Sequence, residues 1–263
     1  MSNDSLGDRM KSYEDVFRLH LPIRMPVVLR IDGKAFHSYT KGCKRPVDEG
    51  LVECMNDTAI ELCKQLQGTQ VAYVQSDEIS LLLNNYKELD TQSWFDNNLQ
   101  KMVSVASSIA GVTFSMNSDK IWGDDCIEGG DGYPVCIPIR KPAYFDARAF
   151  VLPKEDVTNY FIWRQQDATR NSVQMLARSL YSHKECTDKN NSELQEMIFQ
   201  KGTNWNDCPI PQKRGRCIIK QQVERETYNP YEKQNVKTIR NEWVVDNKIP
   251  VFSSDRSYID KYV

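Results

Sequence analysis

Residues 27–37 read VVLRIDGKAFH, in which a run of apolar residues ends at an acid and then breaks at a glycine that basic residues follow. The run is too uniformly apolar for a strand with one face in water, so it predicts a buried strand over residues 27–32. This strand carries the carboxylate of Asp32 to a turn at Gly33.

A second stretch, residues 71–83, reads VAYVQSDEISLLL and joins two apolar runs through a short polar tip. Residues 70–75 and 78–84 are therefore predicted to be the two strands of a hairpin. Ser76 and Asp77 are residue types that favour such turns. The hairpin thus presents a second carboxylate at its tip.

Two helices and one more strand complete the N-terminal half. Asp48 can cap a helix whose apolar residues repeat at intervals of three and four until Gly68 ends it. A second helix fits residues 95–116, and residues 144–152 fit another strand. The order strand, helix, strand, strand, helix, strand predicts an α+β fold with a ferredoxin-like βαββαβ core.

This order brings the two acidic stretches together. The crossover makes the first two strands parallel with one gap between them, and the third strand returns through that gap. The end of the first strand and the tip of the hairpin then lie at the same edge of the sheet. Asp32 and Asp77, which are 45 positions apart in the sequence, are therefore predicted to be neighbours.

The C-terminal half has weaker patterns. Beyond residue 116 we predict an irregular segment (117–142), a long helix (154–181), a short helix (192–200) and two short strands (217–219 and 242–245). We expect a catalytic domain over residues 1–152, beginning with a polar lead-in and a short amphipathic turn. A helical elaboration with strands over residues 153–263 would pack on it to form one compact unit.

The composition is that of a globular protein. The chain has 263 residues and a formal net charge of −2, and it contains no apolar run of about 18 residues that could cross a membrane. Residues 1–5 lack the basic and apolar regions of a secretory signal. We therefore expect a cytoplasmic protein that has no membrane partner.

The eight cysteines are scattered through the chain without a C-x-x-C pair, and there are only three histidines. Zinc sites need paired ligand spacing, and disulfide scaffolds belong to small secreted chains. We expect reduced, mostly buried thiols.

Carboxylates grouped at a sheet edge repel each other unless a cation lies between them. Magnesium suits such a pair because it takes one or two carboxylates and completes its octahedron with water and substrate phosphates. Two such ions could activate an attacking hydroxyl and stabilise a leaving pyrophosphate. The turn at residues 33–35 would add free backbone N–H groups and a lysine for a triphosphate. The alternative is that Asp32 caps a turn and residues 76–77 only close a hairpin.

Other polar residues have two interpretations each. His37 either contacts a base or phosphate, or packs behind the turn. Trp163 and Arg164 are more typical of a helix core with a surface charge than of a stacking platform. The basic residues 213–216 form either a phosphate-contact patch or a solvated loop. The Gly-Gly-Asp at 129–131 lacks the Glu-Phe of the cyclase signature, and we discount it.

Four motifs occur together and in order: RIDGKAFH (30–37), QSDE (75–78), YFDAR (144–148) and WRQ (163–165). Over roughly residues 10–220 they resemble the tRNA-His guanylyltransferase family. The resemblance implies a palm-like domain similar to that of polymerases, used in reverse to add nucleotides to the 5′ end of a tRNA. It also implies two Mg²⁺ ions, nucleoside triphosphates such as GTP and ATP as substrates, tRNA as the partner, and a homotetramer.

The same resemblance implies roles for particular residues. Asp32 and Asp77 would ligate the metal ions together with the Gly33 carbonyl, and Glu78 would support the catalytic pair. The residues that we assign to nucleotide binding are Asp32, Gly33, Lys34, Ala35, Phe36, His37, Arg45, Asp48, Ser76 and Asp77. Those that we assign to nucleic-acid binding are Arg30, Arg148, Arg170, Asn171, Lys213 and Arg214.

One segment departs from the family pattern. Eukaryotic members carry HINNLYN after the WRQ motif, whereas residues 169–175 here read TRNSVQM, without the histidine. This resembles the guanylyltransferase-like branch, whose members favour template-directed repair of 5′-truncated tRNAs. We therefore predict magnesium-dependent 3′-to-5′ nucleotide addition in tRNA repair. The alternatives are addition of G at position −1 of tRNA-His, a non-catalytic protein that binds tRNA or nucleotide, and a nucleotide cyclase.

Overall fold

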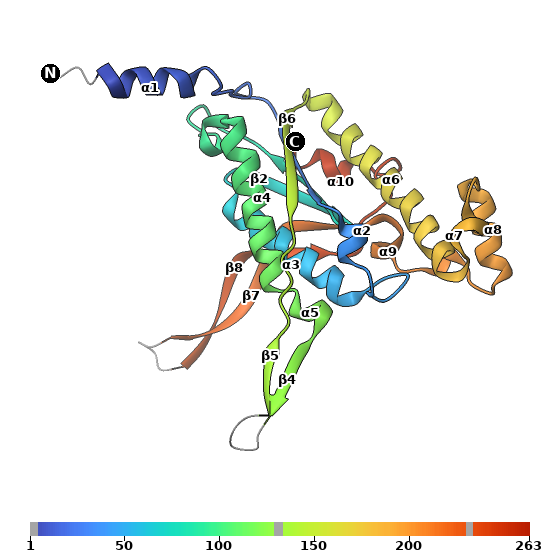
Figure 1. The fold of residues 1–263 in the computed structure, drawn as a ribbon. Helices are drawn as coiled ribbons and strands as arrows, with labels where there is room; N and C mark the ends of the chain where they lie inside the picture. The colour runs from blue at the N-terminus through green and yellow to red at the C-terminus, as the bar shows by residue number, and fades with distance from the viewer. Residues whose placement is uncertain (1–4, 129–133, 230–233) are drawn as a thin grey trace.

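The computed structural model describes residues 5–128, 134–229 and 234–263. A six-stranded antiparallel sheet has the strand order β6-β1-β3-β2-β7-β8. Figure 1 shows the strands of the protein with helices around them. The strands are β1 (Val27–Gly33), β2 (Thr69–Gln75), β3 (Glu78–Leu83), β6 (Phe145–Val151), β7 (Arg216–Asn229) and β8 (Gln234–Asp246). Helices pack on both faces, so the fold is mixed α+β.

The predicted order of the first strands is confirmed. β3 lies between β1 and β2 and pairs antiparallel with both, so β1 and β2 run in the same direction. The N–H of Gly33, at the end of β1, donates to the carbonyl of Asp77 in the hairpin tip at 3.1 Å. The end of β1 and this tip therefore meet at one edge of the sheet, which we call the site edge.

One face of the sheet is covered by α3 (Glu49–Gln65) and α4 (Leu99–Met116). The carboxylate of Asp48 caps α3 by accepting from the N–H of Leu51 at 3.1 Å, as predicted. Gly68 then turns the chain into β2 with φ +86°, where a Cβ would lie 2.7 Å from the carbonyl oxygen of Asn84. Apolar side chains of both helices and the sheet form the main core, including Leu29, Ile31, Met55, Leu62, Ile79, Leu81, Met102 and Phe114.

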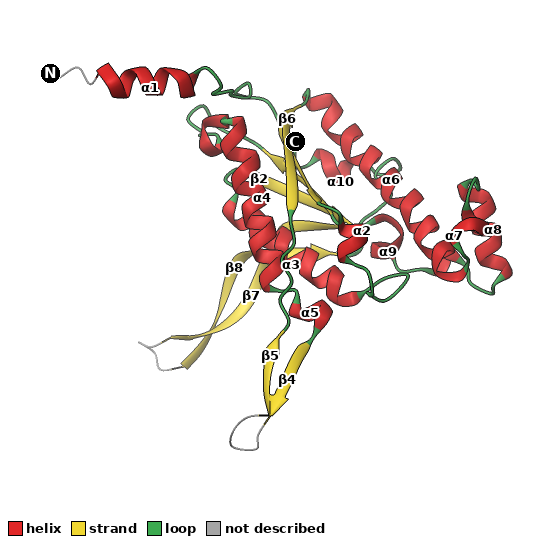
Figure 2. Cartoon of the chain, in the orientation of Figure 1, coloured by secondary structure: helices red, strands yellow, loops and turns green. Residues whose placement is uncertain are grey.

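The other face is covered by α6 (Lys154–Leu180), the long helix that the sequence predicts. Figure 2 shows it as the longest helix, lying across the sheet from α3 and α4. Gln165 of α6 fixes the C-terminal segment, because its amide donates to the Pro250 carbonyl at 2.9 Å and accepts from the Phe252 N–H at 2.8 Å. A second core lies here, with Val28, Tyr73, Leu82, Phe161, Ile249, Phe252 and Ile259 of α10 (Ser257–Asp260).

Three helices gather around the C-terminal end of α6, and the 3-10 turn η2 (Trp205–Asp207) lies among them. They are α7 (His183–Cys186), α8 (Asn191–Gln200) and α9 (Ile210–Arg214). Val173 and Ala177 of α6 pack against Leu194 and Ile198 of α8 in a small third core. The predicted helix at 192–200 is thereby confirmed.

Two predictions for the middle of the chain are wrong, one about an irregular segment and one about the start of a helix. Residues 117–142 are not irregular, because they contain α5 (Asp119–Trp122) and a hairpin of β4 (Asp124–Glu128) and β5 (Pro134–Pro138). The Gly-Gly-Asp at 129–131 lies outside the described residues. The helix predicted from residue 95 begins only at Leu99, because η1 (Trp94–Asn97) holds Phe95, Asp96 and Asn97 at φ of 50°, 52° and 55°.

The strands predicted at 217–219 and 242–245 are much longer than expected. β7 spans 14 residues and β8 spans 13, and their outer part projects from the body (Figure 2). Both faces of this outer part are largely exposed. Its sequence therefore lacks the alternation of apolar and polar residues that predicts a strand. Ion pairs across the strands, such as that of Arg225 with Glu242 at 2.7 Å, tie it together. The C-terminal elaboration therefore combines its helices with two long strands.

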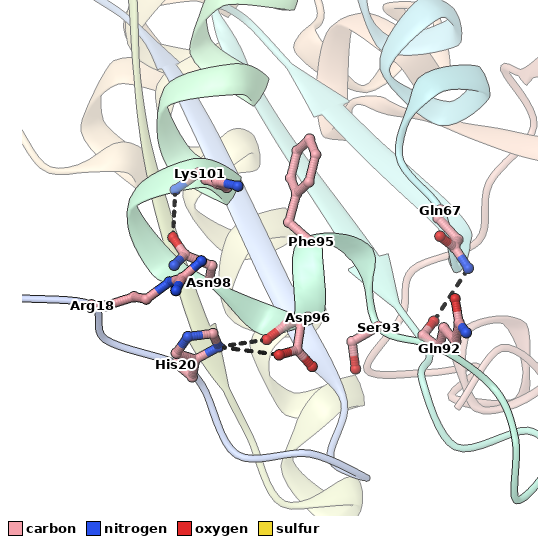
Figure 3. A pocket seen from close by; sticks show the side chains of 9 residues that line it. All are labelled: Arg18, His20, Gln67, Gln92, Ser93, Phe95, Asp96, Asn98 and Lys101. Atoms are coloured by element: carbon pink, nitrogen blue, oxygen red, sulfur yellow. Dashed lines mark hydrogen bonds and ion pairs between the residues drawn. The ribbon is translucent and has the colours of Figure 1, made fainter. Parts of the chain in front are cut away.

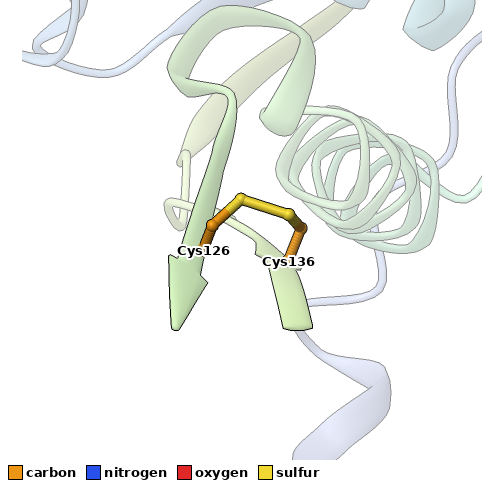
Figure 4. Close-up of a disulfide and its surroundings, with 2 residues drawn as sticks. All are labelled: Cys126 and Cys136. Carbon is orange, nitrogen blue, oxygen red and sulfur yellow. A yellow bond between two sulfur atoms is a disulfide. The ribbon is translucent and has the colours of Figure 1, made fainter. Parts of the chain in front are cut away.

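One pair of cysteines is not reduced. Cys126 and Cys136 face each other across β4 and β5 and form a disulfide (Figure 4). The expectation of free thiols is wrong here because residues taken as irregular form a hairpin that places the two side chains opposite each other. The other six cysteines are free. Among them Cys54 is buried, and burial raises the pKa of its thiol to about 12.

The N-terminal helix α1 (Ser5–Asp15) extends away from the body (Figure 1). It replaces the short amphipathic turn predicted for the lead-in. Among the described residues, no helix combines the length and the apolar composition that crossing a membrane requires.

Candidate functional site

The alternation of side chains along β1 directs two charged residues toward α6. Leu29 and Ile31 pack in the core beneath α3 and α4. Because successive side chains of a strand point to opposite faces, Arg30 and Asp32 point to the face that α6 covers. The register of the neighbouring strand places Glu78 of β3 opposite Asp32. Three charged residues thus gather at the site edge.

The carboxylate of Asp32 lies close enough to Asp77 for its negative charge to affect the Asp77 carboxyl. The pKa of Asp77 is raised above its ordinary value, first by burial and then by the negative charges of Asp32 and Glu78, although hydrogen bonds to its own backbone and to Ser76 oppose the change. Arg30 Nη2 lies 3.9 Å from a carboxylate oxygen of Asp32. Asp32 and Asp77 are therefore neighbouring acids, as predicted, and Arg30 only partly offsets their negative charge.

This donor set suits one class of metal ion. Across the described ranges, no group of three or more His, Cys, Asp or Glu side chains is placed to hold a metal. Two carboxylates with a backbone carbonyl, such as that of Gly33, leave the remaining positions to water and substrate phosphates, as Mg²⁺ prefers. A zinc ion would require nitrogen or sulfur ligands that the site does not offer.

Gly33 is required by the aromatic side chain that follows it. A Cβ at Gly33 would lie 2.3 Å from the ring of Phe36. This ring is only 4% exposed and packs against Phe114 and Phe145, with centroids at 5.3 and 5.1 Å. Phe36 can therefore offer a nucleotide only its backbone.

The backbone donors of this turn differ from those expected. The N–H groups of Gly33 and Lys34 are not free, because they donate to the carbonyls of Asp77 and Tyr144 at 3.1 and 2.8 Å. In the described structure, the N–H groups of residues 35–37 have no intramolecular acceptor. Ala35 takes φ 56° and leads into the short helix α2 (Phe36–Tyr39). The side chains of Lys34 and His37 are exposed beside this turn.

The remaining residues assigned to nucleotide binding lie in different situations. Ser76 is exposed at the hairpin tip with φ 48°. Arg45 is exposed on the loop between α2 and α3. Both oxygens of Asp48 already accept backbone N–H groups, from Leu51 at 3.1 Å and Lys44 at 2.9 Å. The Asp48 side chain therefore shapes the loop, and a direct contact with a nucleotide would cost it a cap.

Glu78 is buried between two arginines. Arg164 of α6 donates from Nε and Nη2 to the two oxygens of Glu78, each at 2.7 Å. Arg30 Nε lies 3.1 Å from Glu78 Oε2, an ion pair whose direction does not make a hydrogen bond. Glu78 therefore has its charge neutralised from within the protein and supports the site without being free to bind a metal.

The sequence interpretation missed Arg164. Trp163 is 48% exposed and Arg164 only 4% exposed, so the predicted helix core with a surface charge is reversed. The signal was present in the spacing, because Arg164 follows the buried residues Tyr160 and Phe161 by four and three positions on the same helical face.

A chain of ion pairs leads from Glu78 to the protein surface. Arg164 also contacts Asp167 at 2.9 Å, and Asp167 accepts from the exposed Arg170 at 2.8 Å. Burial would raise the pKa of Asp167, but the hydrogen bond and charge of Arg170 and the charge of Arg164 lower it below its ordinary value. The buried carboxylate and the exterior of α6 are thus electrostatically linked.

The residues assigned to nucleic acid fall into two groups. Arg170 and Asn171 are exposed on α6, next to Ser172, whose hydroxyl donates to the Lys213 carbonyl of α9 at 3.2 Å. Lys213 and Arg214 therefore lie beside them. Arg148 belongs to the second group, since it pairs in register with Arg30 across β6 and β1.

A separate hollow of about 540 Å³ lies at the opposite end of the sheet strands (Figure 3). It is lined by Arg18, His20, Gln67, Gln92, Ser93, Phe95, Asp96, Asn98 and Lys101. None of these residues was assigned to the site. His20 Nδ1 contacts the Asp96 carbonyl at 2.7 Å, so the hollow marks the place where the N-terminal segment joins η1 and α4.

Comparison with known proteins agrees with this arrangement. A model of the family described as tRNAHis guanylyltransferase matches residues 7–153, which is more than half of the chain. The chain belongs to the tRNAHis guanylyltransferase family. Members of this family are nucleotidyltransferases that act on tRNA.

Solved and curated relatives extend the match over most of the chain. A bacterial tRNA(His) guanylyltransferase-like protein in complex with ATP is 42% identical, with a TM-score of 0.82 over 99% of both chains. The tRNA(His) guanylyltransferase of Schizosaccharomyces pombe is 27% identical over 87% of this chain and 85% of that protein. The enzyme from Saccharomyces cerevisiae shares the fold at 22% identity, with a TM-score of 0.62 over 87% of this chain and 95% of that one.

Proposed function

We propose that this tRNAHis guanylyltransferase family member is a magnesium-dependent 3′-to-5′ nucleotidyltransferase that adds nucleotides to the 5′ ends of tRNAs. The observation that carries the proposal is the pairing of Asp32 with Asp77 at the site edge, where the pKa of Asp77 is raised by burial and by the charge of Asp32. A divalent cation would compensate this pair. The strand order β6-β1-β3-β2 with crossing helices supports a ferredoxin-like, palm-type core.

The residues of the site edge would bind the metal ions and the triphosphate. Asp32, Asp77 and the Gly33 carbonyl would hold two Mg²⁺ ions, which when bound supply activation of the attacking hydroxyl and neutralise charge on the leaving pyrophosphate. The free N–H groups of residues 35–37 would face the triphosphate, and the side chain of Lys34 would add positive charge beside it. Related proteins solved with ATP and with GTP support our proposal that the chain binds both and uses other nucleoside triphosphates.

The tRNA would lie against the basic surface beside the site. Arg170 and Asn171 are exposed on α6 and lie beside the half-buried Lys213 and Arg214 of α9, and these four residues would contact backbone phosphates. The salt link from Arg170 through Asp167 to Arg164 connects this surface to Glu78. Binding of RNA and alignment of the site would therefore be coupled.

Two reactions of the family must be distinguished. Residues 169–175 read TRNSVQM and hold no histidine, and in the structure Thr169 and Arg170 are engaged with α6 itself through Gln165 and Asp167. This favours templated repair of 5′-truncated tRNAs. The likeness to guanylyltransferases named for tRNA(His) favours addition of G at position −1 equally well. We also propose a cytoplasmic homotetramer, from the family resemblance.

One assay tests the chemistry and the choice of substrate. Pyrophosphate release and 5′-extension would be measured with Mg²⁺ on two substrates: a 5′-triphosphorylated tRNA that lacks its first nucleotide, and an intact tRNA-His. We expect templated extension of the truncated tRNA, and loss of at least 10³-fold in rate for Asp32→Ala and Asp77→Ala. Folded variants that retained the rate would overturn the metal assignment.

The same assay separates the alternatives. A single untemplated G on intact tRNA-His, with weak repair, would establish guanylyltransferase activity in its place. Cyclic product from GTP or ATP without any tRNA would indicate a cyclase. Asp90→Ala is the matched control, because Asp90 is exposed on the loop between β3 and η1 and was not assigned to the site, so the variant should keep the wild-type rate.

A further inference from the structure

The N-terminal helix α1 carries a row of apolar side chains that stay exposed in the part of the chain that the structure describes. Leu6, Met10 and Tyr13 of α1 repeat at intervals of four and three, which places them on one helical face, and Phe17 follows four residues later in the turn that ends the helix. Their exposed fractions lie between 44% and 69%. A free amphipathic helix of this length is marginal in water, so it gains stability only by packing.

The base of α1 holds the helix away from the body. Leu21 N–H donates to the Asn97 carbonyl at 2.9 Å, and Leu99 N–H donates to the Leu19 carbonyl at 2.9 Å. Phe17 N–H and Arg18 N–H continue the turns of α1 through the carbonyls of Glu14 and Asp15. Figure 1 shows α1 pointing outward from this base.

The helix α4 offers a matching surface. Residues 102–116 contain no charged side chain, although α4 lies on the outside of the sheet and packs on α3 and β6 from one side only. A surface helix ordinarily carries charged residues on its outer face. Here that face consists of Ser104, Ser108, Val112 and Met116, each four residues apart, with Val112 57% and Met116 58% exposed.

We propose that α1 of one copy packs on the outer face of α4 of a second copy, and that the exchange is mutual. A two-fold dimer makes the same contact twice, because each copy gives one arm and receives one. Aromatic side chains bury about 150 to 250 Å² each. The four-residue apolar stripe, the α4 surface that it would cover and the two-fold repeat together amount to on the order of 1,600 Å², which is the size of a stable interface. This inference gives a surface to the proposed homo-oligomer.

Photo-crosslinking tests the contact directly. The full-length protein would carry p-benzoylphenylalanine in place of Tyr13 and be irradiated at micromolar concentration. We expect a band of doubled mass whose cross-linked peptides come from residues 99–116. The same amino acid in place of Phe199, which is 64% exposed on α8, is the control and should give no such band. Cross-links within one chain, cross-links to another surface of the second copy, or no cross-links would each overturn the proposal.

A second measurement covers the assembly itself. Val112→Glu places a charge on the uncharged face and should weaken association at least tenfold in light scattering, whereas Phe199→Glu should leave the mass unchanged. A Val112→Glu protein that kept its mass would contradict the proposal even if the protein were a tetramer held elsewhere. Neither readout depends on catalysis, so failure here is distinct from failure of the proposed enzyme activity.

Discussion

Arg164 and Glu78 form a two-pronged ion pair in which Nε and Nη2 each lie 2.7 Å from a carboxylate oxygen, and the side chains are only 5% and 6% exposed. The pair joins the middle of α6 to the first residue of β3, immediately after Asp77. The helix thereby fixes the strand end on which the acid pair depends.

Removing one partner of this pair should destabilise the fold strongly. A buried charge that loses its counter-charge costs about 3 to 5 kcal/mol. We therefore expect Arg164→Met to lower the free energy of unfolding by about this amount, as measured by urea denaturation. The double variant Arg164→Met with Glu78→Gln should recover part of the loss, since the buried carboxylate charge is removed with its main partner and Arg30 still has Asp32 at 3.9 Å. Additive losses in the double variant would show that the two residues are not coupled.

Arg164→Lys separates position from charge. Lysine keeps the positive charge but cannot donate in the planar fork that holds both oxygens of Glu78. We expect a lower kcat in 5′-extension with little change in the KM for nucleotide, because the site would be misaligned without losing its ligands. A variant in which only KM rises would indicate that Arg164 contacts the substrate.

Asp77 should destabilise the metal-free protein at neutral pH. Its pKa is raised by burial and by the charge of Asp32, so the folded state holds the proton more tightly than the unfolded state does. The ionised carboxylate therefore costs stability above the raised pKa, and the cost disappears as the pH falls below the ordinary value. In EDTA, Asp77→Asn should raise the Tm at pH 7 and leave it unchanged at acidic pH. A lower Tm at pH 7 would contradict the charge conflict.

Asp167→Asn is the control for Asp77→Asn, because it should change the Tm at pH 7 in the opposite direction. The pKa of Asp167 is lowered, because Arg170 and Arg164 outweigh its burial. Its stabilising effect is present above the ordinary carboxyl pKa and is lost as the pH falls through the lowered value. Asp167→Asn should therefore lower the Tm at pH 7, where Asp77→Asn raises it.

The turn at Gly33 gives a steric prediction. Because a Cβ there would lie 2.3 Å from the Phe36 ring, Gly33→Ala should destabilise the fold by about 1 to 3 kcal/mol and raise the KM for nucleotide. Urea denaturation and initial rates measure both effects. Adding Phe36→Leu, which shortens the obstructing side chain, should restore part of the nucleotide KM. No improvement in the double variant would mean that the ring is not the obstacle.

The sequence predicted the acid pair better than its surroundings. Asp32 and Asp77 became neighbours by strand order alone, because the topology of a sheet follows from the sequence of its elements. The burial of Arg164 was available from helical spacing and was outweighed by the usual preference of arginine for the surface. The occupied N–H groups of Gly33 and Lys34 could not be foreseen, since their acceptors come from residues 77 and 144.

The sequence patterns did not predict the strands that project from the core. The outer part of β7 and β8 is exposed on both sides, so its residues do not alternate between apolar and polar as those of a half-buried strand do. The hairpin of β4 and β5 is likewise supported by pairing across its strands, including the disulfide between Cys126 and Cys136.

The disulfide gives a simple chemical prediction. The purified protein, denatured without reductant, should titrate six thiols with a chromogenic disulfide reagent, corresponding to the six free cysteines. After reduction it should titrate all eight cysteines of the chain. Cys126→Ser with Cys136→Ser should give six thiols under both conditions. Eight thiols before reduction would show that the bond does not form.

Arg170 is where the buried network reaches the proposed RNA surface. Its guanidinium is 57% exposed and pairs with Asp167 three residues earlier, so it can donate to a phosphate while it stays oriented. Arg170→Ala should raise the KM for tRNA and reduce the slope of log affinity against log salt by about 1, as expected for one lost phosphate contact. Lys64→Ala is the matched control, because Lys64 is 56% exposed on α3 and also pairs with an acid three residues earlier, Glu61. Filter binding over a range of salt concentrations would measure both variants. An equal change in slope for the two would mean that the effect reflects net charge, whereas a change confined to Arg170→Ala would identify α6 as the helix that meets the RNA.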